Sequence, residues 1–345
     1  MLRIKSIVKS IGDFTLGPVE LAVENEILVI LGPSGSGKTT LLNVIAGILQ
    51  RDGGKILMGE IDISEEPIEN RSTAIVFQED TLFPHMTVRE NIMYANVEGE
   101  NISKIIDIFG IGKILDRSID TLSGGEKNRV ELARAMASKP KILLLDEPLS
   151  SLDYPVRKKL STDLRKILKR IEIPVIYVTH DRDIAWEIGD KIAIMSGGKI
   201  CQIGTPKNVF KNPKTVVAAE ITGESNIIKM VVSQSGGRGN MVEWGTCKLE
   251  TQVDGLKGGR EVQVCIRPED IVLEKHGEGK NWVEGEIIEK IFKGHRYAVE
   301  LRIEGVRDEI RAYISLNQNE IGNLEQGIPV RVCFPKESIK IISNE

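Results

Sequence analysis

The sequence predicts an α/β domain followed by an all-β domain. In residues 1–223, short apolar runs alternate with longer helical patterns, which is typical of an α/β layer architecture. In residues 224–345 the helical periodicity fades, and short alternating segments between glycine-rich turns indicate β-structure. A glycine-rich loop follows the first apolar run of the first domain. We therefore expect two domains, 1–223 and 224–345.

Five apolar runs predict the strands of the first domain. Most are apolar at nearly every position, so we expect several of these strands to be central and buried on both faces. The predicted strands cover residues 26–32, 72–78, 141–147, 173–180 and 191–200. The predicted helices cover residues 38–48, 87–95, 101–109, 125–138, 154–170 and 181–188.

The glycine-rich loop, GPSGSGKTT, matches the pattern G-x-x-x-x-G-K-[ST] between a predicted strand and a predicted helix. Its backbone N–H groups and the start of the helix favour binding of an anion. We expect Lys38 to reach the β- and γ-phosphates of a nucleotide and Thr39 to hold Mg²⁺. A turn without a ligand is the alternative. The expected nucleotide contacts are Gly32, Pro33, Ser34, Gly35, Ser36, Gly37, Lys38, Thr39 and Thr40.

Polar residues close three further predicted strands, at the sheet edge where ligands of open α/β sheets bind. In KILLLDEP (141–148), Asp146 is expected to complete the Mg²⁺ site and Glu147 to polarise the attacking water. Gln78 is expected to contact Mg²⁺ or that water, and His180 the γ-phosphate. The alternative is that these are solvated or structural polar residues at the ends of strands.

These elements, in this order, resemble the ATP-binding subunit of ABC transporters over residues 1 to about 220. The residues that carry the resemblance are GPSGSGKTT, Gln78, LSGGE (122–126), ILLLDEP (142–148), SSLD (150–153) and His180. The resemblance implies a P-loop NTPase fold of the ABC type that binds and hydrolyses ATP with Mg²⁺. It also implies a homodimer, stacked head to tail, that closes two ATP molecules between its chains.

In that dimer, the resemblance implies that Ser123, Gly124 and Gly125 contact the γ-phosphate of ATP held by the other chain. Two glycines at the start of a helix weaken it by roughly 1 kcal/mol each, but they let a phosphate approach bare backbone N–H groups. Ordinary helix capping by Ser123 is the alternative. Asp153 would couple the two ATP sites. The family usually stacks an aromatic residue on adenine near residue 11, where this chain has an isoleucine; Phe14 is the nearby candidate.

The segment 78–91 looks like the region that importer-type members dock against their membrane permease subunits. Phe83, Pro84 and Met86 would present apolar surface there. The alternative, compatible with docking, is a helix entry with Thr87 as N-cap and Glu90 completing a capping box.

The second domain contains an internal repeat, which predicts two related β units of about 224–275 and 280–345. GREVQVCIRPEDIVL (259–273) and GIPVRVCFPKESIKI (327–341) share residues in register, including Cys265 and Cys333. Small core positions are a better interpretation of these two cysteines than a redox pair. The repeat is expected to form an OB-like, barrel-like all-β domain.

This half resembles the regulatory domain appended to importer ATPases, through IRPEDI (266–271), and most closely its molybdate- and tungstate-linked branch. That branch implies an oxyanion ligand, for which Lys280, Asn281 and Ser315 are candidate donors. A purely dimerising domain is the alternative. Import of iron, sulfate, a polyamine or a sugar is the alternative to import of molybdate or tungstate.

The composition excludes several other classes of protein. A net charge of −4 and few aromatic residues argue against a nucleic-acid partner.

No signal peptide and no membrane-spanning run is expected. We therefore place the chain at the cytoplasmic face of the membrane, in contact with the external solute-binding protein only indirectly. A soluble ABC ATPase acting on DNA or ribosomes, or an anion sensor with a vestigial ATPase, is the alternative function.

Overall fold

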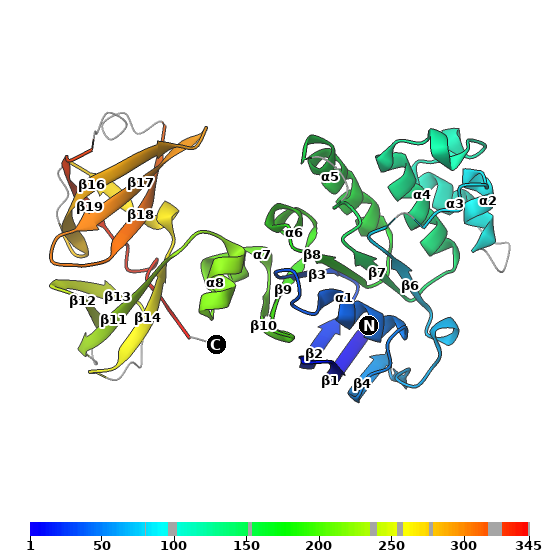
Figure 1. Ribbon diagram of the computed structural model, residues 1–345, viewed down its shortest axis with the longest axis horizontal. Coiled ribbons are helices and arrows are strands. Elements are labelled where there is room, and N and C mark those ends of the chain that lie inside the picture. The colour runs from blue at the N-terminus through cyan, green and yellow to red at the C-terminus, as the bar shows by residue number, and fades with distance from the viewer. Residues whose placement is uncertain are drawn as a thin grey trace. The chain divides into compact units, whose positions relative to one another are not determined.

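The computed structural model describes residues 1–79, 81–95, 102–150, 154–234, 240–253, 258–275, 279–316 and 326–343 (Figure 1). Contacts divide the chain into two compact units, Met1–Val209 and Phe210–Glu345. This division falls before the change of composition at residue 224, because α8 (Val216–Thr222) groups with the second unit.

The first unit is built on a six-stranded sheet with the strand order β10-β9-β3-β8-β7-β6. Neighbouring strands from β9 to β6 are parallel, and β10 runs antiparallel to β9. As the apolar runs predict, β3, β7 and β8 are buried at every position. The strand expected over 191–200 forms two strands, which a Gly-Gly turn connects. The bounds are β3 Ile27–Leu31, β6 Thr73–Val76, β7 Ile142–Asp146, β8 Val175–Thr179, β9 Lys191–Ser196 and β10 Lys199–Gly204.

A second, antiparallel sheet with the order β2-β1-β4-β5 was not predicted from the sequence. In β1 the register shifts between Ile4 and Ile7, and again before Lys9. These irregularities break the alternation of buried and exposed positions that identifies a strand in a sequence. The bounds are β1 Leu2–Ile11, β2 Phe14–Val23, β4 Gly53–Met58 and β5 Ile61–Asp62.

The six expected helices all form, each within two residues of its expected ends. Helix α1 packs against β6 and β7, α6 against β3 and β8, and α5 against α6. The bounds are α1 Lys38–Ala46, α2 Val88–Tyr94, α3 Ile102–Phe109, α4 Gly124–Ala137, α5 Tyr154–Arg170 and α6 Arg182–Ile188. Short elements not predicted are α7 Pro206–Lys211, α8, and the 3₁₀ turns Ile68–Asn70, Gly112–Ile114, Ile119–Thr121 and Pro268–Asp270.

The second unit contains two five-stranded antiparallel sheets, in the orders β13-β12-β11-β14-β20 and β15-β19-β16-β17-β18. The strands of the first are β11 Asn226–Gln234, β12 Asn240–Trp244, β13 Cys247–Thr251, β14 Glu261–Ile266 and β20 Lys340–Ile342. The strands of the second are β15 Val272–Glu274, β16 Trp282–Phe292, β17 Arg296–Ile303, β18 Glu309–Ser315 and β19 Pro329–Cys333.

The two sheets correspond strand by strand, and each contains one strand from the other half of the repeat. Strands β11 to β14 match β16 to β19 in order and pairing. However, β15, which follows β14 in the chain, pairs with β19, and β20, which follows β19, pairs with β14. The two repeats therefore exchange their last strands.

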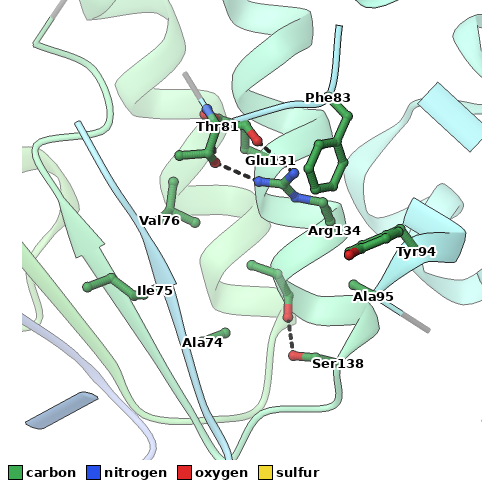
Figure 2. Close-up of a pocket in the computed structure, with 11 residues that line it drawn as sticks. Ala74, Ile75, Val76, Thr81, Phe83, Tyr94, Ala95, Glu131, Arg134 and Ser138 are labelled. Carbon is green, nitrogen blue, oxygen red and sulfur yellow. Dashed lines mark hydrogen bonds between the residues drawn. The ribbon is translucent and has the colours of Figure 1, made fainter. Parts of the chain in front are cut away.

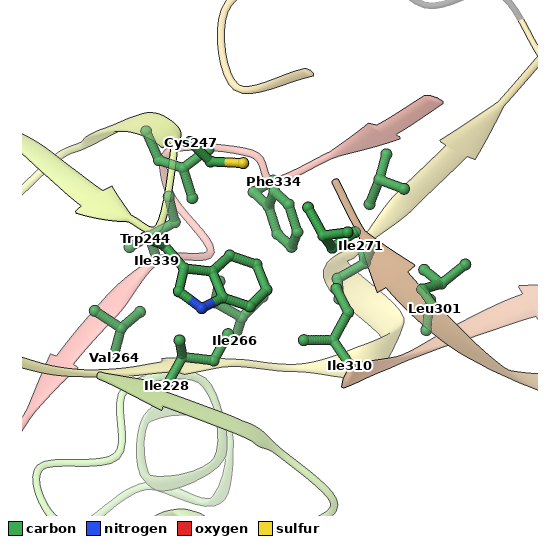
Figure 3. Packing of buried hydrophobic residues seen from close by; sticks show 14 of the residues in the cluster. Ile228, Trp244, Cys247, Val264, Ile266, Ile271, Leu301, Ile310, Phe334 and Ile339 are labelled. Carbon is green, nitrogen blue, oxygen red and sulfur yellow. The ribbon is translucent and has the colours of Figure 1, made fainter. Parts of the chain in front are cut away.

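One apolar core joins these two sheets (Figure 3). Trp244 and Phe334 lie near its centre, with their rings edge to face and 6.1 Å between centroids. Cys265 is buried in a smaller cluster with Ala219 and Ile342, and all four cysteines are free thiols. Burial raises the pKa of the Cys265 thiol, which keeps it protonated.

Arg267, the arginine of the IRPEDI motif, has a structural role in the second unit. Arg267 is only 3% exposed, and its guanidinium donates to the carbonyl oxygens of Ala219, Glu224 and Phe210 at 3.0–3.1 Å. It also lies over the Phe210 ring, 4.5 Å from the centroid. Arg267 thus fastens the helical segment around α8 to the β-structure of the same unit.

Candidate functional site

Parallel strands bring the predicted site residues to one edge of the first sheet. Strands β3, β8, β7 and β6 are neighbours, so their carboxyl ends lie side by side. Gly32, His180, Glu147 and Gln78 follow these strands. The order of the strands, rather than proximity in the chain, therefore assembles the site.

The phosphate loop joins β3 directly to α1. Gly37 precedes the helix with φ 99°, a left-handed conformation that favours glycine. At Gly32, a Cβ atom would lie 2.1 Å from the carbonyl oxygen of Met195, so the backbone approach excludes any side chain. The first turn of α1 carries no acidic residue, which leaves the positive end of its dipole available to an anion.

Two polar groups of this loop are suited to a phosphate. Lys38 is 6% exposed, and its Nζ donates to the carbonyl oxygens of Gly32 and Pro33 at 3.0 and 2.9 Å. Burial lowers the pKa of Lys38, against the opposing attraction of Glu147 and Asp146. The Ser36 hydroxyl oxygen is buried without a hydrogen-bond partner, and a bound phosphate would give it one.

Asp146 and Thr39 bring a carboxylate and a hydroxyl together beside the phosphate loop. The Thr39 hydroxyl donates to Asp146 Oδ1 at 3.2 Å, and Asp146 is 6% exposed. Burial raises the pKa of Asp146, the Thr39 hydrogen bond opposes that shift, and the neighbouring Glu147 adds to it. A hydroxyl and a carboxylate are the hard oxygen donors that Mg²⁺ prefers, so these residues fit a Mg²⁺ ion.

Glu147 occupies a different environment from its neighbour Asp146. It lies directly after β7 with φ 47°, unusual for a residue with a side chain, and its amide donates to Val178 O at 3.1 Å. Its Oε1 lies 2.8 Å from His180 Nδ1, and its side chain is 14% exposed against 58% for His180. The strained backbone thus aims this carboxylate at the histidine that follows β8.

Two other predicted residues lie near this site with less definite roles. Gln78 follows β6 and is exposed. Phe14 is partly buried against the core of the first unit, and its Cζ is the atom that a Cβ on Gly37 would meet at 2.7 Å. The ring therefore lies against the end of the phosphate loop, whereas Ile11 is 45% exposed.

The start of α4 combines a helix cap with exposed backbone. The Ser123 hydroxyl accepts from Glu126 N at 3.4 Å, and the Glu126 carboxylate accepts from the Ser123 amide at 2.8 Å, which is a capping box. Helix capping by Ser123 is therefore confirmed, and its contact with a phosphate stays a prediction. At Gly125 a Cβ would lie 2.9 Å from Leu160 Cδ2, because α5 packs closely there. Asp153 lies outside the described residues.

The start of α4 borders an open cavity of about 790 Å³ between α4 and α5. Ser123, Gly124 and Gly125 line it, together with Glu126, Arg129, Pro155, Val156, Lys159, Leu160 and Asp163.

The segment 78–91 borders a groove of about 370 Å³ (Figure 2). Phe83 packs edge to face against Tyr94, with 4.8 Å between centroids, and Tyr94 is 67% exposed. The capping box of Thr87 and Glu90 is confirmed. The groove is lined by Ala74, Ile75, Val76, Thr81, Phe83, Tyr94, Ala95, Glu131, Arg134, Ala135 and Ser138.

Sequence reasoning missed the α4 residues that hold this segment. Arg134 donates to Thr81 O at 2.8 Å and lies 5.3 Å from the centroid of Phe83, and Glu131 accepts from Thr81 N at 2.9 Å. Their spacing of three on one helix face was the available signal. Charged residues on one face of a predicted helix are normally expected to be solvent-exposed, so their contact with Thr81 was not predicted.

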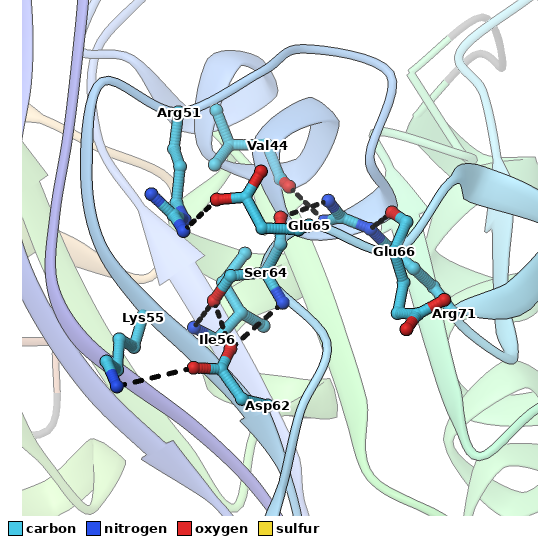
Figure 4. A network of polar contacts seen from close by, with 9 residues as sticks. All are labelled: Val44, Arg51, Lys55, Ile56, Asp62, Ser64, Glu65, Glu66 and Arg71. Carbon is cyan, nitrogen blue, oxygen red and sulfur yellow. Dashed lines mark hydrogen bonds and ion pairs between the residues drawn. The ribbon is translucent and has the colours of Figure 1, made fainter.

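Arg71 was also missed, although it fixes the other end of the helix that follows the phosphate loop (Figure 4). It is 6% exposed and donates to the carbonyl oxygens of Val44 and Ile45, in the last turn of α1, at 2.9 and 3.0 Å. It also donates to Ser64 O at 2.9 Å. A cation at the carboxyl end of α1 complements the dipole whose other end faces the phosphate loop.

The candidate oxyanion donors of the second unit have other partners. The Asn281 carboxamide donates to Glu250 O and Phe334 O at 2.8 Å and accepts from Glu250 N at 2.6 Å. Both of its N–H donors are used, which removes Asn281 from the candidate donors. Lys280 Nζ lies 2.5 Å from Glu250 Oε1, and Ser315 is exposed at the end of β18.

In the described part of the chain, no helix is long and apolar enough to cross a membrane, and no cluster of three or more His, Cys, Asp or Glu residues resembles a metal site.

Two family profiles match the chain. The profile described as "ABC transporter" matches residues 18–150, and the profile described as "TOBE domain" matches residues 264–342. The first includes the phosphate loop, the α4 start, Asp146 and Glu147. The second includes Arg267 and most of the second repeat.

Curated relatives match across both units. The spermidine/putrescine import ATP-binding protein PotA of Borrelia garinii subsp. bavariensis is 38% identical over 308 residues, covering 85% of each chain. The molybdate/tungstate import ATP-binding protein WtpC of Pyrococcus abyssi is 34% identical over 353 residues, covering 99% of this chain and 100% of that one.

Solved structures of ATP-binding cassettes match the first unit. A nucleotide-free cassette from an ABC transporter has a TM-score of 0.57 and 28% identity, covering 65% of this chain and 99% of that one. A dimeric cassette in a post-hydrolysis state, bound to ADP and phosphate, has a TM-score of 0.50 and 26% identity, covering 59% and 98%.

Proposed function

The chain belongs to the family of ATP-binding subunits of ABC importers, ATPases coupled to transport, and from this we propose how its residues hydrolyse ATP. The phosphate loop, with Lys38 and Ser36, binds the β- and γ-phosphates. Thr39 and Asp146 hold Mg²⁺, which neutralises phosphate charge when bound. Gln78 contributes to the same shell, and Phe14 contacts adenine.

The observation that carries the mechanism is the contact between Glu147 and His180. Glu147 accepts a proton from the attacking water, and a general base must be held within hydrogen-bond reach of that water. The strained backbone of Glu147 and the 2.8 Å contact with His180 Nδ1 fix the carboxylate in one orientation. His180 would then contact the γ-phosphate through the exposed edge of its ring.

Replacing Glu147 with glutamine tests this assignment. Glu147→Gln keeps the shape and one hydrogen-bonding oxygen but cannot accept the proton, so turnover is expected to fall at least about a hundredfold. ATP affinity, measured by equilibrium binding of a fluorescent analogue, is expected to stay within about threefold. Hydrolysis near the wild-type rate would show that another residue is the base.

We also propose that the groove beside 78–91 receives a helix of a membrane permease subunit. Its apolar residues, with Phe83 and Tyr94 at the rim, would contact an apolar helix face, and Arg134 would lie beside them. Glu131 and Arg134 hold Thr81 from α4, the helix that Ser123 caps. Motion of the permease would thereby be transmitted to the start of α4, which is expected to contact the ATP held by the other chain. The chain would work at the cytoplasmic face of the membrane and affect the external binding protein only through the permease.

For the solute, we propose an oxyanion of the molybdate or tungstate kind. The molybdate/tungstate relative matches this chain from end to end, including both repeats of the second unit. A polyamine is the second candidate, because the spermidine/putrescine relative has the higher identity, 38% against 34%.

Uptake by cells that lack this chain separates the two candidates. Loss of high-affinity uptake of labelled molybdate, with unchanged uptake of labelled spermidine, is expected, and a plasmid copy of the gene should restore it. A copy with Glu147→Gln is the matched control, because it assembles without hydrolysis. Loss of spermidine uptake alone would assign the chain to polyamine import.

A further inference from the structure

We propose that Arg157 is a positioning residue for ATP hydrolysis, because its ion pair with Asp181 fixes the backbone that carries His180. The inference rests on the proposed roles of Glu147 and His180. Arg157 contacts Asp181, the residue that follows His180, and it acts through that residue. No catalytic motif in the sequence includes it.

The ion pair is the first contact of a regular polar stripe on α5. Side chains four residues apart lie on one face of a helix, and Arg157, Ser161, Arg165 and Lys169 follow that spacing. All four meet α6 or the residues flanking it. Arg157 contacts Asp181 at 3.0 Å, Ser161 and its neighbour Thr162 contact Glu187, and Arg165 and Lys169 contact Asp190 at 3.3 and 2.5 Å.

Asp181 is held at three of its atoms. Its Oδ1 accepts from the amides of Asp183 and Ile184 and so caps α6, and its own amide donates to the Thr179 hydroxyl at 2.9 Å. Its Oδ2 takes Arg157 at 3.0 Å. The Arg157 and Asp181 side chains are only 24% and 21% exposed, so this pair is shielded more than an ordinary surface pair.

His180 depends on this arrangement because packing does not hold its ring. The side chain is 58% exposed, and its contact with Glu147 is 2.8 Å long. The direction of the ring is therefore determined by this contact and by the backbone between Thr179 and Asp181. Without Arg157, Asp181 keeps its cap but loses its tie to α5, and the ring would sample orientations away from Glu147. Misplacement of a group by about 1 Å can cost orders of magnitude in rate.

The stripe also provides a matched control, since Lys169 makes an equivalent ion pair at its far end, on Asp190. We would compare Arg157→Met and Lys169→Met in the full-length chain, both well below their melting temperatures. Arg157→Met is expected to lower kcat about tenfold with the KM for ATP unchanged within about twofold. Lys169→Met is expected to leave both constants within about twofold, at a similar loss in Tm. Equal kcat in the two variants would overturn the proposal.

Arg157→Lys keeps the charge and the helix and serves if the methionine variant does not fold. The shorter reach and single ammonium are expected to give a kcat between those of wild type and Arg157→Met, about threefold below wild type. A wild-type kcat for Arg157→Lys together with an unfolded Arg157→Met would make Arg157 structural and overturn the proposal. Failure of the proposed function has a separate signature, because Glu147→Gln would then retain hydrolysis.

Discussion

At the scale of single residues, two adjacent carboxylates occupy different environments. Asp146 is nearly inaccessible and bonded to Thr39, whereas Glu147 turns out of the strand toward His180. Burial raises the pKa of Asp146, so holding its charge costs the folded chain free energy. In the proposed Mg²⁺ site that cost would be tolerated, because a metal ligand must be ionised.

This cost predicts that Asp146→Asn stabilises the nucleotide-free chain. A group with a raised pKa in the folded state favours folding below its unfolded pKa, about 4, and this contribution is lost as pH rises through the folded pKa. At pH 7 the asparagine variant is expected to be about 1 kcal/mol more stable to urea, with the difference vanishing below about pH 4. Its ATPase activity should be lost. Lower stability at pH 7 would contradict this reasoning.

At the scale of elements, we propose that the start of α4 serves two purposes through one serine, helix capping and contact with a phosphate. The capping box with Glu126 satisfies the first turn of the helix, while the cavity beside it leaves Ser123 and Gly124 accessible. Bonds from the Ser123 amide and hydroxyl lower the pKa of Glu126, so the cap is complete above about pH 4 and weakens as pH falls.

Two substitutions at Ser123 separate these purposes. Aspartate caps a helix as well as serine, but its carboxylate would lie beside that of Glu126, which accepts from the Ser123 hydroxyl at 2.8 Å, so Ser123→Asp should lose about as much stability as Ser123→Ala. The negative charge of the aspartate would repel a phosphate and abolish turnover. Ser123→Ala should lose about 1 kcal/mol of stability. Denaturant titration with steady-state ATPase assays distinguishes them, and full activity in Ser123→Asp would leave only the capping role.

Elements with strong periodicity were predictable, and elements defined by distant partners were not. The parallel strands and the six main helices follow from apolar runs and helical spacing. Sheet β2-β1-β4-β5 was missed because of its register shifts, and α7 and α8 because they are short. In the site, Lys38, Thr39, Asp146 and Glu147 are marked by local motifs. Arg71, Arg134 and Arg157 are not, because their acceptors are remote in the sequence.

At the scale of the whole molecule, the residues of the proposed ATP site lie on two different surfaces of one chain. Lys38, Asp146 and Glu147 belong to the sheet edge, whereas Ser123 faces the cavity between α4 and α5. In the proposed homodimer each ATP would meet one set from each chain. A solved relative of the first unit, which is dimeric and bound to ADP and phosphate, supports this proposal.

If each ATP site is shared between two chains, the ATPase activity must depend on the concentration of the chain. The turnover rate per chain is expected to rise with chain concentration between roughly 0.1 and 10 µM and then level off, because only the dimer is complete. Mixing inactive Ser123→Asp with inactive Glu147→Gln should restore some activity, since one of the two composite sites is then intact. A constant rate per chain and no restoration would indicate that each chain hydrolyses ATP alone.

The exchange of strands in the second unit has a consequence for the order in which the chain folds. Strand β14 is made early but waits for β20, near the end of the sequence, whereas β19 finds β15 already synthesised. Pairing of strands so far apart in the sequence is slow, because a long loop must close first. During synthesis the first repeat would expose an unpaired strand edge until the last strand leaves the ribosome, and that interval is when this protein is most open to aggregation.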